Sequence, residues 1–405
     1  MEGFISLILA LAAALVAVPV AIFVIEMIAA VAASPRSMPS IGNRLDQAQR
    51  IAVLVPAYNE SAGLRPTLLD IKPQLQPRDR LLVVADNCTD DTAAIASSHG
   101  AEVIERHNAV KRGKGYALAF GLQHLSSDPP TIVIIVDADC RLSDNAINGL
   151  ATKCATTGRP AQALDLMTAP ADAQVNQRVA EFAWRVKNWL RPAGLAALRL
   201  PCQLMGTGMA FPWDVIRSVD LASGSIVEDM KLGLDLAANG HPPVFCPSAL
   251  VMSQFASTTK GSLTQRERWE GGHIATILTV LPHLLGKSLA RRDLNLLALT
   301  LDLLVPPLSL LALLAIVVLA CTFVWALLGF SSLPFLLSSA AFLAFVLAGF
   351  LAWLKCGRDI LPVRQLPSIV AYVFKKLGLY RVILFGKTAQ SWTRTERKNS
   401  KRPMP

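Results

Sequence analysis

The segment Thr131-Ile-Val-Ile-Ile-Val-Asp-Ala-Asp139 decides the fold, because it places two carboxylates directly after five apolar residues. An apolar run rich in Ile and Val predicts a strand that is buried on both faces. If the chain stays extended beyond it, Asp137 and Asp139 point to the same side. Two carboxylates on one side repel each other unless a cation lies between them, and Mg²⁺ or Mn²⁺ prefers such oxygen ligands.

Shorter apolar runs precede this strand and alternate with helical patterns. We predict strands at 51–55, 81–84 and 102–105, and helices near 61–75, 91–99 and 114–125. Apolar strands that alternate with helices indicate a parallel sheet covered on both faces. In such a sheet, ligands bind beyond the carboxyl ends of the strands. The predicted fold class is therefore α/β, with its chemistry along that edge.

Polar residues follow the first two predicted strands at this edge. The first strand ends in Pro56-Ala57-Tyr58-Asn59-Glu60 and the second in Ala85-Asp86-Asn87-Cys88-Thr89-Asp90-Asp91. Asn and Asp at such places also cap the next helix, and we favour that structural role for Asp90 and Asp91. Capping does not explain Asp137 and Asp139, which follow a buried strand without a break.

A basic loop, Lys111-Arg112-Gly113-Lys114-Gly115, lies between these acidic segments in the sequence. Two glycines let the backbone come close to a ligand, and three cations suit a diphosphate. A solvated basic loop is the alternative interpretation.

Two long stretches without charge lie outside this central part, at residues 3–25 and 303–354. The first is long enough to cross a hydrocarbon core of roughly 30 Å as a helix. A signal peptide is the alternative, but the start of the chain has no basic region. The second stretch suits a hairpin of roughly 303–328 and 335–354, with turn residues at 329–334.

Lys and Arg beside the predicted spans set the expected orientation. These residues are Arg36, Arg44, Arg50, Lys287, Arg291, Arg292, Lys355 and Arg358. If the N-terminus lies outside, all of them flank the cytoplasmic side. We therefore expect a multi-pass protein of the inner cell membrane whose central part and C-terminal tail are cytoplasmic.

Composition argues against two other classes of protein. Much of the net charge of +10 comes from nine basic residues between Lys375 and Arg402. Beside a membrane span, such a tail fits anionic lipid headgroups better than nucleic acid, so we expect membrane lipids and no nucleic acid as partners. The seven cysteines are scattered without a C-x-x-C pair, which predicts neither a zinc site nor a disulfide framework.

Six motifs, in this order, resemble those of a family 2 glycosyltransferase with a GT-A fold. The first four are V-P-A-Y-N-E (55–60), A-D-N-C-T-D (85–90), K-R-G-K-G (111–115) and D-A-D (137–139). The last two, V-E-D (227–229) and Q-R-E-R-W (265–269), resemble motifs of the membrane-bound cellulose, chitin and hyaluronan synthase branch. The resemblance implies a Rossmann-like α/β GT-A domain with a mostly parallel sheet, on the cytoplasmic face, between transmembrane helices.

The resemblance also implies a role for individual residues. Donor binding is implied for Pro56, Tyr58, Glu60, Asp86, Lys111, Lys114, Asp137 and Arg268. Acceptor binding is implied for Gly206, Thr207, Gln265 and Trp269. Asp139 is implied as the ligand of Mg²⁺ or Mn²⁺, and Asp229 as the catalytic base.

The function implied is inverting transfer of a sugar from a nucleotide diphosphate donor, with UDP-sugars expected first, in cell-surface polysaccharide synthesis. The acceptor is a glycan or a lipid-linked molecule, and both chain elongation and single addition to a polyprenyl-linked carrier stay open, as does oligomerisation. The alternatives are a catalytically inactive membrane scaffold and a nucleotidyltransferase. The acidic residues and Arg268 argue against the first, and the Q-R-E-R-W segment argues against the second.

The predicted organisation has six parts. They are a transmembrane helix over 1–33, a linker over 34–50, the GT-A domain over 51–270, an interfacial helix region over 271–292, a transmembrane hairpin over 293–356 and a basic tail over 357–405.

Overall fold

The computed structural model describes the chain except for residues 34–48, 171, 223–227, 256–258 and 386–405. Most of the predicted linker, Val227 and the end of the basic tail therefore lie outside the described residues. The chain divides into two compact units, which we describe separately. The sheet unit contains 35–170 and 201–269, and the helical unit contains 1–34, 171–200 and 270–388.

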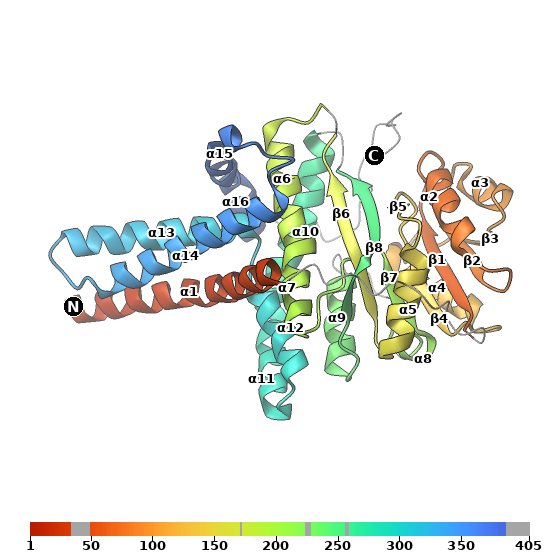
Figure 1. Ribbon diagram of the computed structural model, residues 1–405, viewed down its shortest axis with the longest axis horizontal. Helices are drawn as coiled ribbons and strands as arrows, with labels where there is room; N and C mark the ends of the chain where they lie inside the picture. Colours follow the sequence, from red (N-terminus) through yellow and green to blue (C-terminus); the bar gives the residue numbers. More distant parts are fainter. Residues whose placement is uncertain (34–48, 171, 223–227, 256–258, 386–405) are drawn as a thin grey trace. The chain divides into compact units, whose positions relative to one another are not determined.

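Eight strands form one sheet in the described part of the sheet unit, in the order β3-β2-β1-β4-β7-β6-β8-β5 (Figure 1). The strands are β1 (Ile51–Ala57), β2 (Arg80–Asp86), β3 (Glu102–Arg106), β4 (Ile132–Ile135), β5 (Arg141–Leu142), β6 (Ala161–Thr168), β7 (Met209–Pro212) and β8 (Val244–Gln254). The helices are α2 (Leu64–Ile71), α3 (Thr92–Ser98), α4 (Lys114–Leu125), α5 (Ala146–Thr157), α8 (Trp213–Ile216) and α9 (Glu228–Ala238). Helix α10 (Thr259–Thr279) continues from this unit into the helical unit.

The first four strands pair in parallel, β3 with β2, β2 with β1 and β1 with β4. The buried residues of β1, β2 and β4 are mainly apolar on both faces, as a sheet between two helical layers requires, whereas the edge strand β3 carries Glu102, Glu105 and Arg106. Val53 and Val55 share one core with α2, α3 and α5. Leu54 shares the other with α4, α8 and α9. The three shorter strands predicted from the sequence correspond to β1, β2 and β3.

The second half of the sheet changes direction at β7. Strand β7 runs antiparallel to β4, and Met209 at its start lies opposite Ile135 at the end of β4. The residues just before β7 are therefore brought to the carboxyl ends of the parallel strands. Strands β6 and β8 pair in parallel, and β5 closes the edge antiparallel to β8.

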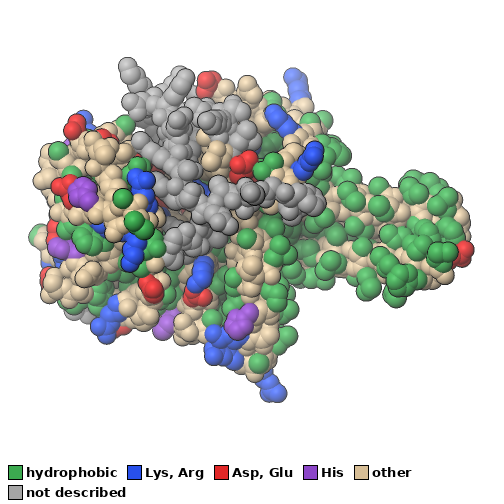
Figure 2. All heavy atoms as spheres, turned by 180° about the vertical axis from the view of Figure 1, so that it is seen from behind, with side chains coloured by type: hydrophobic (Ala, Val, Ile, Leu, Met, Phe, Trp, Pro, Cys, Tyr) green, Lys and Arg blue, Asp and Glu red, His purple; other side chains and the backbone are tan. Residues whose placement is uncertain are grey.

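The helical unit contains the apolar segments of the chain. Its helices are α1 (Glu2–Ala32), α6 (Val175–Arg185), a π-helical turn (Val186–Leu190), α7 (Arg191–Ala197), α11 (Leu281–Arg291), α12 (Leu294–Leu304), α13 (Leu308–Leu327), α14 (Leu333–Cys356), a 3₁₀ turn (Val363–Gln365), α15 (Pro367–Lys375) and α16 (Leu377–Phe385). Among the described residues, three helices are long and apolar enough to cross a membrane, α1, α13 and α14. They run side by side (Figure 1), and apolar side chains cover their outer surface (Figure 2).

Residues 171–200 lie within the range predicted for the GT-A domain, and they pack as part of the helical unit. The predicted domain bounds stay a prediction. The contact of residues 171–200 with α1 is close, since a Cβ atom at Gly194 would lie only 2.1 Å from the carbonyl oxygen of Glu26. Glycine thus lets α7 pack directly on the backbone of α1.

A buried ion cluster fixes α7 between α1 and α12. The Nε atom of Arg191 lies 2.6 Å from Oε2 of Glu26, and the Nη2 atom of Arg191 lies 2.5 Å from Oδ1 of Asp302. All three residues are less than 10% exposed. Removing one partner from such a cluster leaves an uncompensated buried charge, which costs more than the intact cluster contributes.

Arg191→Met should therefore destabilise the helical unit by about 3–5 kcal/mol, because it leaves two buried carboxylates without their cation. Thermal unfolding in detergent measures the effect. Arg358→Met, at an exposed arginine of the same unit, is the matched control. Equal unfolding midpoints for the two variants would show that the cluster does not stabilise the fold.

Candidate active site

The loops after β1 and β2 are joined by side-chain hydrogen bonds. The main-chain N–H of Thr89 donates to Oδ1 of Asn59 over 2.7 Å, and the N–H of Glu60 donates to Oγ1 of Thr92 over 2.8 Å. Asn59 has a φ of +52°, a conformation that Asn tolerates better than most residues. These contacts hold the half-buried residues Tyr58 and Glu60 beside the end of β2.

Asp90 also joins the loops after β1 and β2. Its Oδ2 atom accepts from the N–H of Ser61 over 3.2 Å, and its Oδ1 accepts from the N–H of Thr92 over 3.1 Å. Burial would raise the pKa of Asp90, but the hydrogen bonds from Thr92 and Ser61 outweigh it and lower the pKa. The carboxylate therefore stays ionised at neutral pH. Its contribution is complete above the ordinary pKa of Asp and is lost as the pH falls through the lowered value.

An ion pair that the sequence analysis did not anticipate holds Asp86 at the end of β2. Nη1 of Arg106 lies 2.6 Å from Oδ1 of Asp86, and both side chains are nearly buried. Nη2 of Arg106 donates to the carbonyl oxygen of Lys111 over 2.6 Å. One arginine thus connects the acidic end of β2 to the basic loop. Its only signal in the sequence is its place at the end of a weak strand.

The basic loop is ordered through its backbone. The N–H of Lys111 donates to Oδ1 of Asn108 over 2.7 Å, while the side chains of Lys111 and Arg112 are exposed. The loop ends at Gly113, whose φ of +130° favours glycine, and Lys114 begins α4. Lys114 is the cation of this loop that reaches inward.

Lys114 lies at the centre of the site. Its Nζ atom forms an ion pair with Oδ1 of Asp137 and donates to the carbonyl oxygen of Gly206 over 2.6 Å. The N–H of Asp137 donates to Oγ1 of Thr207 over 3.1 Å. A Cβ atom at Gly206 would lie 3.1 Å from Oδ2 of Asp229. Four separate segments of the chain therefore meet within a few ångströms.

Asp139 takes a different direction from Asp137. Strand β4 ends at Ile135, and the chain turns after Asp137, so the predicted extended geometry does not continue. Asp139 lies instead beside the start of α2, where a Cβ atom at Gly63 would be 3.3 Å from both Cβ of Asp139 and Oε2 of Glu60. Glu60 and Asp139 therefore approach the same spot from different strands.

Strand β6 places two buried polar residues near the site, Gln162 and Asp165, and neither was predicted. Nε2 of Gln162 donates to the carbonyl oxygen of Thr207, and its Oε1 accepts from the N–H of Met205, over 2.9 and 2.8 Å. Asp165 is 3% exposed. Burial, followed by the charges of Asp137 and Asp165, raises the pKa of Cys140 well above its usual range, so this cysteine stays a thiol.

The remaining predicted residues occupy other positions. Pro56 lies inside β1, opposite Val84 and beyond the last residue that pairs with β4, so its missing N–H breaks no bond to β4. Gln265 is buried in α10, and Arg268 and Trp269 follow it there, partly buried. The approach of these α10 residues to the strand ends stays a prediction.

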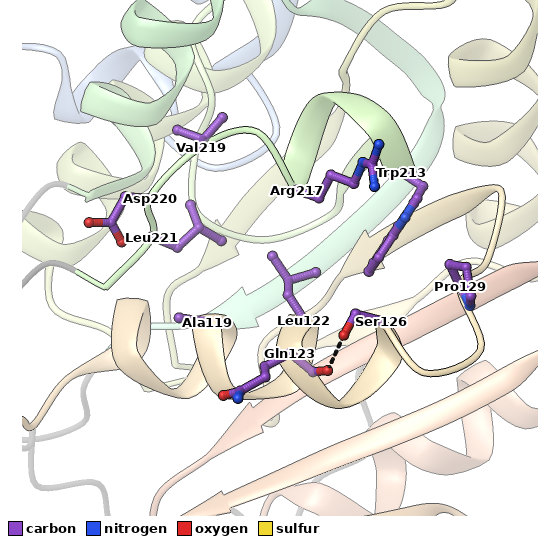
Figure 3. Close-up of a pocket in the computed structure, with 10 residues that line it drawn as sticks. All are labelled: Ala119, Leu122, Gln123, Ser126, Pro129, Trp213, Arg217, Val219, Asp220 and Leu221. Atoms are coloured by element: carbon purple, nitrogen blue, oxygen red, sulfur yellow. Dashed lines mark hydrogen bonds between the residues drawn. The ribbon is translucent and has the colours of Figure 1, made fainter.

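A shallow pocket lies away from this site. It is lined by the second half of α4 and by the segment around α8, including Leu122, Trp213, Arg217 and Leu221 (Figure 3). Leu122 is eight residues beyond Lys114, which is about 12 Å along the helix. The pocket is thus at the opposite end of α4 from the carboxylates.

The residues at the strand ends suit a divalent cation that is shared with a ligand. Among the residues that the structure describes, no three His, Cys, Asp or Glu side chains are close enough to enclose an ion. Mg²⁺ and Mn²⁺ commonly take one or two carboxylates from the protein and the remaining oxygens from phosphates and water. Asp139, with Glu60 nearby, offers such a partial set, and Lys114 adds a fixed positive charge for a phosphate.

The family model described as glycosyltransferase-like family 2 matches residues 48–272, more than half of the chain. The chain belongs to glycosyltransferase family 2. This confirms the predicted family and the prediction of a glycosyltransferase. The membrane-bound synthase branch stays a prediction.

Two curated relatives carry related names. "Probable glycosyltransferase YdaM" of Bacillus subtilis is 23% identical over 269 residues, which cover 61% of this chain and 60% of that protein. Glucosyl-3-phosphoglycerate synthase of Mycobacterium tuberculosis is 37% identical over 95 residues, which cover 22% of this chain and 28% of that protein. The match thus spans less than two thirds of either relative.

A solved structure extends the likeness to nearly the whole chain. Mannosyltransferase PcManGT from Pyrobaculum calidifontis, in complex with GDP-Man and Mn²⁺, has 17% sequence identity and a TM-score of 0.51, and the match covers 94% of this chain and 99% of that one. This likeness concerns the fold, and it confirms the predicted GT-A architecture.

Gly206→Ala should lower sugar transfer by between about tenfold and a hundredfold, because the added methyl group presses on the Asp229 carboxylate and displaces it. Gly158→Ala is the matched control, since Gly158 also has a positive φ but open space around its Cβ position. Both variants carry backbone strain of roughly 1–3 kcal/mol. Turnover and thermal stability should be measured together, and an equal loss of turnover in both would contradict the contact.

Proposed function

We propose that this glycosyltransferase moves a sugar from a nucleotide diphosphate donor to a glycan or lipid-linked acceptor at the cytoplasmic face of a membrane. The observation that carries the proposal is the convergence of Lys114, Asp137, Gly206 and Asp229 at the carboxyl ends of the strands. That place offers a cation to a leaving phosphate and a carboxylate to an attacking hydroxyl.

The donor lies along the loops after β1, β2 and β3. Tyr58, Glu60 and Asp86 hold the nucleoside, and Arg106 fixes Asp86 for that task. Lys114 faces the diphosphate, together with the exposed Lys111 of the basic loop. A similar fold holds GDP-Man with Mn²⁺ in the mannosyltransferase from Pyrobaculum calidifontis. We expect UDP-sugars first and GDP-sugars second as donors.

Asp139 would hold Mg²⁺ or Mn²⁺, and Asp137 would lie near the ion and the ribose. When bound, the ion neutralises charge on the leaving diphosphate. Lys114 supplies a second positive charge that the chain itself holds in place, because its ammonium is fixed by Asp137 and by the carbonyl oxygen of Gly206.

The transfer is a single displacement. The acceptor hydroxyl gives its proton to the carboxylate of Asp229, and its oxygen forms a bond to the anomeric carbon. The bond between that carbon and the phosphate oxygen breaks, and the nucleoside diphosphate leaves with the electron pair. Attack from the opposite side inverts the anomeric configuration. Gly206, Thr207, Gln265 and Trp269 line the acceptor, and Arg268 contacts the diphosphate.

A screen of UDP- and GDP-sugars on the purified membrane protein tests this function. Asp139→Asn should abolish turnover, and EDTA should do the same to the unchanged protein, because the leaving charge is no longer neutralised. Asp144→Asn, at an exposed carboxylate nearby, should keep turnover. Full activity in EDTA would rule out the metal, and no donor hydrolysis at all would favour the inactive scaffold.

Asp229→Asn should lower kcat by about 10²-fold or more while donor affinity stays nearly unchanged, because the base acts in the transition state. The matched control is Asp235→Asn on the same helix, whose carboxylate pairs with Lys231 at the surface over 2.7 Å. Turnover and calorimetric titration of the donor separate the two effects. A loss of donor affinity without a loss of kcat would remove Asp229 from the role of base.

The helical unit would place this reaction at the membrane. Its three long apolar helices support membrane association, and the basic residues beside them favour a cytoplasmic sheet unit. Helix α11 exposes Leu289 next to Arg291 and Arg292, which suits an anionic membrane surface. Reporter fusions at residue 331 and at the C-terminus should therefore report opposite sides, and agreement between them would overturn the topology.

A further inference from the structure

Helix α10 is one continuous helix with two different faces. Gln265, Arg268 and Trp269 are three and four residues apart, so they share a face. Glu270 follows Arg268 by two residues, and residues two apart on a helix do not face each other. Whatever holds Glu270 therefore acts on the side of the helix away from Arg268.

Glu270 is held by the C-terminal end of the described chain, through Tyr380 on α16 and Lys376 just before that helix. Its Oε1 atom forms an ion pair with Nζ of Lys376, and its Oε2 accepts from the hydroxyl of Tyr380 over 2.7 Å. The Tyr380 hydroxyl also lies 2.6 Å from Oγ of Ser309, at the start of α13. The contacts thus connect α10 to α16, to the residue that joins α15 and α16, and to one of the long apolar helices.

The cluster of Glu270, Lys376 and Tyr380 is largely buried. The side chains of Lys376 and Glu270 are 10% and 15% exposed, and Tyr380 is 3% exposed. Burial, and then the charge of Glu270, raises the pKa of Tyr380 far above its usual range, so its hydroxyl stays a donor. The Lys376 ammonium also lies 5.2 Å from the centroid of the Tyr372 ring.

Apolar packing supports the same contact. Ile274, one turn beyond Glu270, belongs to a buried cluster with Leu313, Val373 and Tyr380. Gly271 leaves room for Ile383, which would touch a Cβ atom there at 3.8 Å. The rotation of α10 about its own axis is therefore fixed from one side, by polar and apolar groups together.

We propose that Lys376 and Tyr380 are positioning residues for the Gln265–Trp269 face of α10. They hold Glu270 and so set the direction in which Arg268 and Trp269 project. The inference rests on the proposed function, in which Arg268 contacts the donor diphosphate. The C-terminal helices then take part in sugar transfer without contributing a group that touches the substrate.

The test compares ligands that do and do not reach Arg268. Lys376→Met and Tyr380→Phe should each weaken the affinity for a nucleoside diphosphate by about tenfold and lower kcat, because a small rotation of α10 misplaces the guanidinium. The affinity for the nucleoside monophosphate should stay unchanged. Thr322→Val is the matched control, since it removes a buried hydroxyl contact with Ser338 between α13 and α14.

The same measurements in an Arg268→Ala background decide between coupling and simple loss of stability. If Lys376 acts through Arg268, Lys376→Met should have little further effect on diphosphate affinity there. Additive losses, equal losses for monophosphate and diphosphate, or a matching loss in Thr322→Val would each overturn the positioning role. If Arg268→Ala alone leaves diphosphate affinity and turnover intact, the proposed role of the Gln265–Trp269 segment fails, and the positioning role fails with it.

Discussion

The hydrogen bonds of Lys114 are the constraint on which the site depends. One ammonium group neutralises Asp137 at the end of β4 and binds the carbonyl oxygen of Gly206 just before β7. Without that cation, the carboxylate of Asp137 and the carbonyl oxygen of Gly206 would have no positive charge between them. The change of direction between β4 and β7 brings these groups together, and Lys114 makes their closeness stable.

The helical unit is held together mainly by apolar packing rather than by a polar network. Most of its cohesion comes from apolar side chains, which have no preferred partner and leave rotation and depth weakly specified. Polar clusters such as those around Arg191 and around Glu270 supply that specificity. Each has a carboxylate whose partners come from other helices, so a wrong rotation would leave a charge buried and unpaired.

The sequence was informative where chemistry follows a strand directly. Asp137 and Asp139 stand out because two charged residues directly follow a buried apolar strand. Their order in the chain with Asp86 and Lys114 predicted the fold and the edge of the sheet at which the site lies. Arg106 and Gln162 could not be found this way, because their partners lie 20 and 45 residues away in the chain and meet them only through strand register. The packing of residues 171–200 in the helical unit could not be read from the sequence for a similar reason, since a helical pattern does not say which core it joins.

The buried carboxylate of Glu26 also bears on how the chain is made. Arg191 is 165 residues downstream, and Asp302 follows after another 111. At about 5–20 residues per second, a ribosome needs on the order of 10–30 s to deliver the arginine after Glu26 has emerged. During that interval the first helix carries an acidic group without the arginine that pairs with it in the folded chain. In the proposed membrane orientation, the final insertion of this helix would wait for the middle of the chain, and nascent chains cut short before Arg191 should leave the membrane more readily than longer ones.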